Sequence, residues 1–304
     1  MSDSKVRWAR LSIVSNSLLT VLKIIVGIAT GSVSIAAEGL HSGMDLLASI
    51  ITYISVRIGG RKADRTHHFG HGKVENFAGM LEGILIFGGG AIIIWEAVPK
   101  LYTGKGPEAL GWGLGVMAFS SLVNFFVSRK LFSIAKKTDS PALAADAWHL
   151  RTDVYTSAGV LFGLGLIKVT GMPIFDPIVA LAVAAFIMKA AYDITKEGFA
   201  HMVDVTLPED ELEKIKASIE RHGDNFLEFH ELRARKSGSE RFIDLHIVMP
   251  RNLPLAKAHE LCDLVEADIE RELPNSHVLT HPEPCENTCK DCGLAPKEEG
   301  RTCA

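Results

Sequence analysis

Two pairs of ionisable residues share the same spacing within stretches that are otherwise made of lipid-soluble side chains. His41 and Asp45 lie four residues apart in "AAEGLHSGMD", and His149 and Asp153 repeat that spacing in "DAWHLRTDV". Residues four apart lie on the same face of a helix. If the two helices pack together, two imidazole nitrogens and two carboxylate oxygens form a tetrahedral set, the geometry that zinc prefers. The spacing therefore predicts a divalent-metal site inside an apolar bundle.

Other polar residues in these stretches have a simpler interpretation. A single intramembrane histidine can line a pore or form a hydrogen bond without binding metal, and the repeated H-x-x-x-D spacing is what favours the metal site. Glu38, one turn before His41, falls near the outer end of its segment, where we expect a solvated carboxylate. Lys23, Glu82 and Glu96 are expected to form helix–helix pairs or to extend toward the interface.

The segments that carry these residues are long enough to cross a membrane. The chain has 304 residues, 47% of them hydrophobic, and a formal net charge of −4. A transmembrane helix needs roughly 20 mainly apolar residues. The first segment is too long for a signal peptide and lacks a small-x-small cleavage site, so we expect it to be retained. Six spans are predicted, at about 9–30, 34–57, 77–99, 109–130, 142–168 and 175–197.

Basic residues are concentrated in one set of the loops between these spans. Lysine and arginine cluster before residue 11, at 57–73 and at 129–137, whereas the opposite loops carry Lys100, Lys105 and Lys168. By the positive-inside rule both termini face the cytoplasm. The expected location is the inner (plasma) membrane, with several passes through it.

The last third of the chain has the pattern of a soluble domain. "DVTLPEDELEKIKASIERHG" predicts a helix, with Thr206 and Glu209 as a capping box. "FLEFHELRAR" and "RFIDLHIVMP" predict two strands, a helix follows at about 254–273, and "SHVLTH" predicts a third strand. The order αββαβ indicates an α+β domain with its helices on one face of a sheet. We divide the chain into a membrane domain (1–203), a cytosolic domain (204–284) and a cysteine-containing tail (285–304).

Three stretches together resemble a known family. "GSVSIAAEGLHSGMD", "HHFGHGKVE" and "DAWHLRTD" are similar to motifs of the cation diffusion facilitator family, and more closely of its bacterial dimeric zinc/ferrous-iron efflux branch. The resemblance implies six transmembrane helices, a ferredoxin-like cytosolic domain, a homodimer, and exchange of divalent metal for protons. In close bacterial relatives the first transport ligand is usually aspartate. His41 stands there in this sequence, which favours zinc.

The resemblance also implies further sites. Lys73 and Asp204 match a charge pair that acts as a hinge near the dimer contact. His68 is an additional loop imidazole without a clear counterpart, and a solvated polar loop or surface histidines are the alternatives for the two accessory sites. The implied metal sites are a transport site (His41, Asp45, His149, Asp153), a loop site (Asp64, His67, His71) and a cytosolic binuclear site (His230, His246, His259, His281, Glu283).

All five cysteines follow residue 261, in the part that we place in the cytosol, where reduced thiols or metal ligands are expected rather than disulfides. Cys285, Cys289 and Cys292 have the spacing C-x3-C-x2-C, which suits a soft-metal site, and reduced thiols on an irregular tail are the alternative. Cys262 is expected to pack inside its helix.

These patterns predict a Zn²⁺/H⁺ antiporter that is not an enzyme. The same antiport with Fe²⁺, Cd²⁺, Co²⁺ or Mn²⁺ as main substrate is the alternative. "GHGKVE" lacks the glycine spacing and the Ser/Thr of a phosphate-binding loop, and "HELRA" and "HELCD" lack the second histidine of a zinc-protease motif. A membrane-bound metal sensor would leave the two buried pairs unexplained. We expect no organic cofactor and no nucleic-acid partner.

Overall fold

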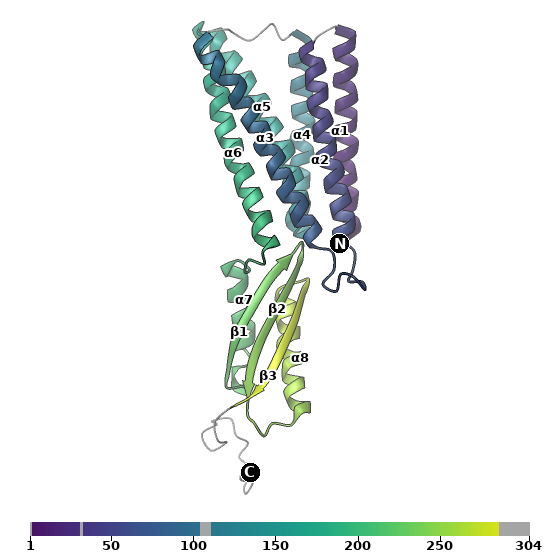
Figure 1. Cartoon of the computed structure of the whole chain (residues 1–304), viewed down its shortest axis with the longest axis vertical. Coiled ribbons are helices and arrows are strands. Elements are labelled where there is room, and N and C mark those ends of the chain that lie inside the picture. The colour runs from purple at the N-terminus through teal and green to yellow at the C-terminus, as the bar shows by residue number, and fades with distance from the viewer. Residues whose placement is uncertain (1, 31–32, 104–110, 286–304) are drawn as a thin grey trace. The chain divides into compact units, whose positions relative to one another are not determined.

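Six long helices form the first part of the chain (Figure 1). The computed structural model describes residues 2–30, 33–103 and 111–285, and the chain divides into two units, Met1–Met202 and Val203–Ala304. The first unit contains α1 (Ser2–Thr30), α2 (Val33–Gly59), α3 (Lys73–Thr103), α4 (Gly111–Thr138), α5 (Pro141–Thr170) and α6 (Phe175–Met202).

The ends of α5 show how the local sequence sets the helix bounds. Ser140 is the N-cap and its side chain accepts a hydrogen bond from the backbone N–H of Leu143, while Pro141 occupies the first helical position, where its missing N–H costs nothing. Gly171 ends the helix in a left-handed conformation (φ 73°) that glycine adopts without strain. These caps fix where α5 begins and ends, and within the helix the four-residue spacing places His149 and Asp153 on one face.

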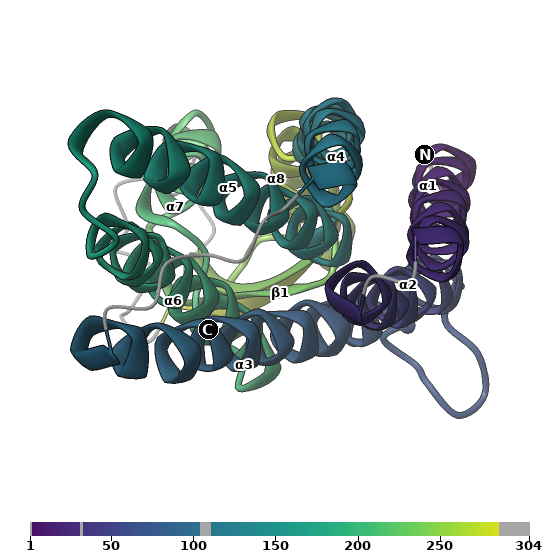
Figure 2. The same ribbon diagram turned by 90° about the horizontal axis from the view of Figure 1, so that it is seen from above.

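The six helices pack mainly as neighbouring pairs. Seen from above, α1 lies beside α2, α3 beside α6, and α4 beside α5 (Figure 2). The ligand-bearing helices α2 and α5 also contact each other. By length and composition alone, three stretches of the described residues are apolar enough to cross a membrane: Asp3–Ala29, Lys73–Tyr102 and Phe175–Met202.

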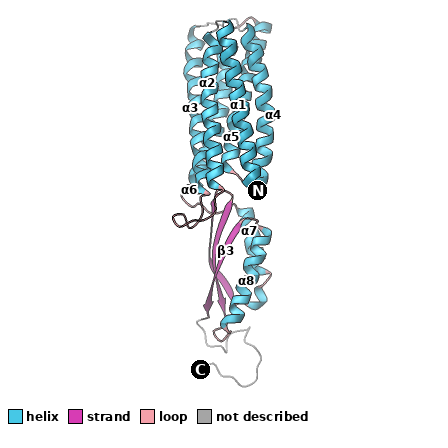
Figure 3. Ribbon diagram, turned by 90° about the vertical axis from the view of Figure 1, so that its right-hand side faces the viewer, coloured by secondary structure: helices cyan, strands magenta, loops and turns pink. Residues whose placement is uncertain are grey.

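The second unit is an α+β domain with the predicted order αββαβ. It contains α7 (Glu209–Glu220), a short 3-10 turn (Gly223–Asn225), β1 (Glu228–Ser237), β2 (Glu240–Met249), α8 (Leu255–Glu272) and β3 (Ser276–Pro284). The sheet order is β1-β2-β3, with β1 antiparallel and β3 parallel to β2. Both helices lie on the same side of the strands (Figure 3), as predicted.

Alternation along β2 separates the two faces of this sheet. Ile243, Leu245 and Ile247 are fully buried against α7 and α8, so the residues between them, including His246, face the other side. The capping box predicted for α7 is wrong. Pro208 is the N-cap and no side chain caps the helix. The residue before a proline is disfavoured in the helical conformation, so the helix begins after Pro208 and Thr206 lies outside it.

Candidate metal sites

The central ligand set lies between α2 and α5 in the first unit. Asp45, His149 and Asp153 each offer a ligand atom, and these atoms all lie within 4.8 Å of one another. Asp45 Oδ1 is 3.0 Å from His149 Nε2, and the two side chains are 7% and 12% exposed. His41 belongs to α2, one turn before Asp45, but its side chain lies outside the described residues. The structure thus brings together three of the four residues predicted for the transport site.

The helix α4 also contacts this set. Asn124 Nδ2 donates a hydrogen bond of 3.3 Å to Asp153 Oδ2. Asp45, Asp153 and Asn124 line a cavity of about 60 Å³, together with Lys23, Met117, Ser120, Ser121, Thr156 and Ser157. Lys23 Nζ donates to Ser42 Oγ at 2.7 Å, which links α1 to α2, as expected for a helix–helix contact. Ligands for a cation therefore converge on a small polar cavity.

A second layer of buried polar groups lies next to these candidate ligands. Asp146, one turn before His149, accepts a hydrogen bond of 3.2 Å from Ser49, and Glu82 accepts one from Thr52. Both carboxyl groups are fully buried, and each keeps one oxygen without a hydrogen-bond partner in the described part of the chain. The contact of Glu82 with α2 is the helix–helix pairing expected from the sequence. Asp146 was not predicted, because its sequence neighbours give no sign of the α2–α5 contact.

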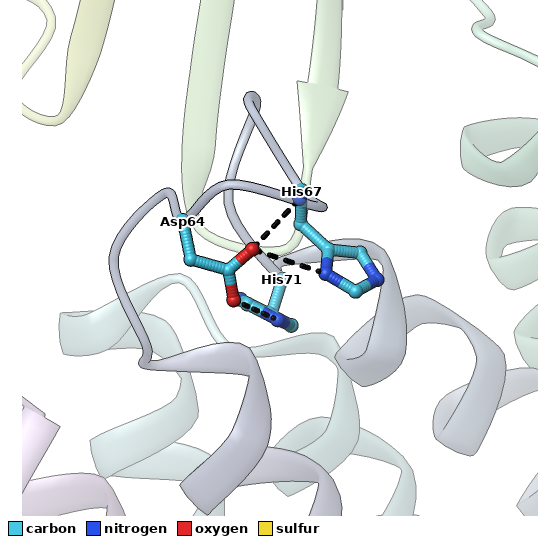
Figure 4. A group of neighbouring side chains, drawn as sticks. All are labelled: Asp64, His67 and His71. Carbon is cyan, nitrogen blue, oxygen red and sulfur yellow. Dashed lines mark hydrogen bonds and ion pairs between the residues drawn. The ribbon is translucent and has the colours of Figure 1, made fainter.

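A separate group of ligands lies in the loop between α2 and α3 (Figure 4). Asp64 Oδ1 is 3.4 Å from His67 Nδ1, and Asp64 Oδ2 is 3.4 Å from His71 Nε2. The backbone N–H and hydroxyl of Thr66 and the backbone N–H of His67 donate to Asp64 Oδ1, each at 2.8 Å. These hydrogen bonds hold the pKa of Asp64 well below its usual range. Asp64 is therefore an ionised carboxylate at neutral pH that could bind a cation, and His68 does not belong to the group.

A third group lies on the face of the cytosolic sheet that points away from the helices. Register places His230, His246 and His281 side by side on the three strands. Glu283 Oε1 is 2.9 Å from His246 Nδ1, and Glu283 Oε2 is 3.3 Å from His230 Nε2. The ring of His281 is 4.8 Å from that of His246, and its Nε2 is 3.8 Å from Glu283. Two imidazole nitrogens, from His230 and His246, and the carboxylate of Glu283 lie within 4.8 Å of one another, with His281 beside them, a donor set that suits zinc.

His259, the fifth residue predicted for this site, is not part of the group in a single chain. It lies on α8, which packs on the opposite face of the sheet, and its ring is 3.6 Å from Asp263 and largely exposed. Its part in the binuclear site stays a prediction.

The predicted hinge residues each have other partners in the structure. Lys73 Nζ donates to the carbonyl of Met202 at 3.2 Å. Asp204, in the second unit, accepts a hydrogen bond of 3.2 Å from Arg235 Nη1. The pairing of Lys73 with Asp204 stays a prediction.

Of the cysteines, Cys262 and Cys285 fall among the described residues. Cys262 is buried in the helical core as expected, and burial raises the pKa of its thiol to about 11, which makes it a poor nucleophile and ligand. Cys285 is buried at the end of β3 and its N–H donates to the carbonyl of Met249. Cys289 and Cys292 lie outside the described residues, so the tail site stays a prediction.

A helical bundle with a candidate metal site between its helices, joined to a separate α+β domain, is the architecture of a membrane carrier of divalent cations. Residues 9–203 match the cation efflux transmembrane domain, and residues 207–285 match the cytoplasmic domain of cation efflux proteins. The chain therefore belongs to the cation efflux family, also called the cation diffusion facilitators, whose members are transporters and not enzymes. The family and the fold class predicted from the sequence are confirmed.

Several named proteins are similar over most of their length. The cation-efflux pump FieF of Citrobacter koseri is 33% identical over 279 residues, which cover 92% of each chain. The uncharacterized transporter sll1263 of Synechocystis is 33% identical over 258 residues, covering 85% of this chain and 83% of that protein. Among solved structures, a zinc form of CzrB is 35% identical and covers 27% of this chain and 92% of its own, with a TM-score of 0.26.

Proposed function

We propose that this cation efflux protein exports Zn²⁺ from the cytosol in exchange for protons, and that the ion passes through the site formed by His41, Asp45, His149 and Asp153. The observation that carries the proposal is the close approach of Asp45, His149 and Asp153 in the interior of the bundle. Burying carboxylates far from water costs several kcal/mol per ion unless opposite charge compensates them. A divalent cation supplies that charge, and so do protons.

Competition for the same atoms explains how metal and protons would exchange. An imidazole nitrogen binds metal only when it carries no proton, and a carboxylate oxygen binds metal only when ionised. Asp45 Oδ1 and His149 Nε2 lie 3.0 Å apart. A metal ion bound here would be coordinated by both atoms, and protonation of either atom would remove it as a metal ligand. Protonation from outside therefore releases the ion, and loss of protons to the cytosol prepares the site for the next one.

Zinc is proposed as the main substrate because of the ligand types. Two imidazoles and two carboxylates favour zinc, whereas a set richer in carboxylates suits harder ions such as Mn²⁺. Fe²⁺, Cd²⁺, Co²⁺ and Mn²⁺ are the competing substrates.

The remaining expectations complete the proposal. The protein acts as a homodimer in the inner membrane with both termini in the cytoplasm. Zinc also binds the group around Glu283 and the loop group around Asp64, where it stabilises the cytosolic part and does not itself cross the membrane. Lys73 and Asp204 act as a hinge pair near the dimer contact.

Transport by the purified full-length chain in liposomes tests the proposal. Zn²⁺ uptake should follow an imposed pH gradient, and Asp45→Ala should abolish it while zinc binding to the cytosolic domain remains. Glu38→Gln is the matched control, because Glu38 is an acidic residue of the same helix that we assign no metal-binding role. A Zn²⁺ flux that does not change with the imposed pH gradient would contradict the proposed antiport. For selectivity, His41→Asp should shift the preference from Zn²⁺ toward Mn²⁺ and Fe²⁺; an unchanged preference would contradict the assignment of His41.

A further inference from the structure

One face of α4 presents two buried oxygen atoms to the transport cavity. Ser120 and Asn124 lie four residues apart, are 5% and 6% exposed, and both line the cavity that contains Asp45 and Asp153. Ser120 Oγ and Asn124 Oδ1 have no hydrogen-bond partner among the residues that the structure describes. Neither residue belongs to the four-residue ligand set on α2 and α5.

The neighbouring carboxylate fixes the orientation of the Asn124 amide. Its Nδ2 donates to Asp153 Oδ2 at 3.3 Å. The reverse orientation would place the amide carbonyl against the carboxylate oxygen, and two acceptors repel each other. Asn124 Oδ1 is therefore the free end of the amide.

A buried carbonyl oxygen without a donor is unfavourable, because it has lost its water without replacement. In a cavity, such an oxygen is satisfied by a water molecule or a cation. The volume of about 60 Å³ is enough for an ion with a water molecule beside it. Three further oxygen-bearing side chains, Ser121 on α4 and Thr156 and Ser157 on α5, line the same cavity, so its lining is rich in neutral oxygen atoms.

We propose that α4 supplies additional oxygen ligands to the transported cation: Asn124 Oδ1 directly, and Ser120 Oγ directly or through a water molecule. The inference rests on the proposed transport site and extends it from four ligands to more than four. Zn²⁺ in a tetrahedral site does not need the additional oxygens, whereas Mn²⁺ prefers six ligand atoms that are mainly oxygen. Asn124 is thus a specificity-determining residue that allows the site to hold oxygen-preferring ions as well as zinc.

The test compares Mn²⁺ and Zn²⁺ transport by the native chain and three variants in liposomes. Asn124→Ala removes both ends of the amide and should lower Mn²⁺ transport relative to Zn²⁺ by about tenfold, equivalent to about 1.4 kcal/mol. Asn124→Asp keeps an oxygen but loses the donor to Asp153, and should retain Mn²⁺ transport better than Asn124→Ala. Ser128→Ala, on α4 but outside the cavity lining, removes a buried hydroxyl that already donates to the carbonyl of Phe125, and should leave the Mn²⁺/Zn²⁺ ratio unchanged.

Calorimetric titration of each metal into the same variants measures binding separately from transport. The accessory metal sites are the same in all variants, so differences in affinity between variants report on the transport site. Equal losses for both metals in Asn124→Ala, or equal Mn²⁺ losses in Asn124→Ala and Asn124→Asp, would show that the residue only positions Asp153 and would overturn the proposal. A native chain that neither binds nor moves Mn²⁺ would overturn it as well. Zn²⁺ flux that does not depend on pH would contradict the proposed antiport instead. The Mn²⁺/Zn²⁺ transport ratio would still test whether α4 supplies ligands to the cation.

Discussion

Gly198 lies at a close approach of α6 to α3, and its replacement by alanine should destabilise the membrane domain. An added Cβ at Gly198 would lie 2.9 Å from both the Cβ and the backbone nitrogen of Met80, and 3.0 Å from the carbonyl oxygen of Asn76. Two of these three atoms belong to the backbone of α3 and cannot rotate away. The two helices must therefore move apart along one of the most extensive helix contacts of the bundle.

Two opposing effects set the magnitude. Alanine in place of glycine in a helix interior contributes about 1 kcal/mol of stability. Forcing an extra carbon into a closely packed contact costs typically 1–3 kcal/mol, and contact with backbone favours the upper end, about 3 kcal/mol. The net loss is about 2 kcal/mol. For a domain of this size the melting temperature changes by about 2–4 °C per kcal/mol, so Gly198→Ala should lower it by about 4–8 °C.

Thermal unfolding of the full chain in detergent measures this effect, with Gly88→Ala as the matched control. Gly88 lies in α3, and an added Cβ there meets nothing within 4 Å, so this substitution should leave the melting temperature unchanged or raise it by about 2–4 °C. Equal melting temperatures for Gly198→Ala and the native chain would show that α3 and α6 separate without cost. A similar drop in the melting temperature of Gly88→Ala would show that the close contacts of Gly198 with α3 are not the cause.

Three further predictions concern charged groups. Glu75→Gln removes the negative charge that lies 2.9 Å from the buried Lys5 ammonium and should lower the free energy of unfolding in detergent by about 3–5 kcal/mol; the double variant with Lys5→Met should recover most of it, and no recovery would contradict a pairing effect. His246→Ala removes the residue that contacts Glu283 and faces the other two histidines, so elemental analysis should find less zinc per chain; an unchanged content would exclude the group as a zinc site. Contact with His222 lowers the pKa of Asp268, so its contribution to stability is present above the unfolded pKa of about 4 and is lost as pH falls through the folded value. The difference in melting temperature between the native chain and Asp268→Asn should therefore narrow below about pH 4, and a constant difference would contradict the assignment.

The part of the transport site that follows from helix periodicity could be predicted from the sequence. The four-residue spacing alone places His149 and Asp153 on one face of a helix, and it does the same for His41 and Asp45. These two faces form a ligand set if the two helices pack against each other. The 3.0 Å contact between Asp45 and His149 is that packing. The alternation along β2 likewise predicted which residues form the cytosolic core and left His246 on the opposite face.

The residues that the sequence did not reveal act through contacts between helices. Asn124 is a single asparagine in an apolar stretch, and its relation to Asp153 exists only because α4 packs against α5. Asp146 carries no motif, yet it is as buried as any ligand. No local sequence pattern shows which helices are neighbours, so neither Asn124 nor Asp146 could be predicted from the sequence.

The structure separates two kinds of buried charge in the membrane domain, and this distinction points to function. Glu75 has both oxygens engaged, by Lys5 and by the hydroxyl of Ser140, so the protein itself compensates the charge and its role is to fasten α1, α3 and α5. Glu82 and Asp146 each keep an oxygen without a partner among the described residues, as does one ring nitrogen of His149. Such atoms raise the free energy of the folded state until a proton, a water molecule or a metal ion reaches them. Charges that the chain satisfies by itself hold the helices together, whereas those it leaves partly unsatisfied surround the place where we propose that the cation binds.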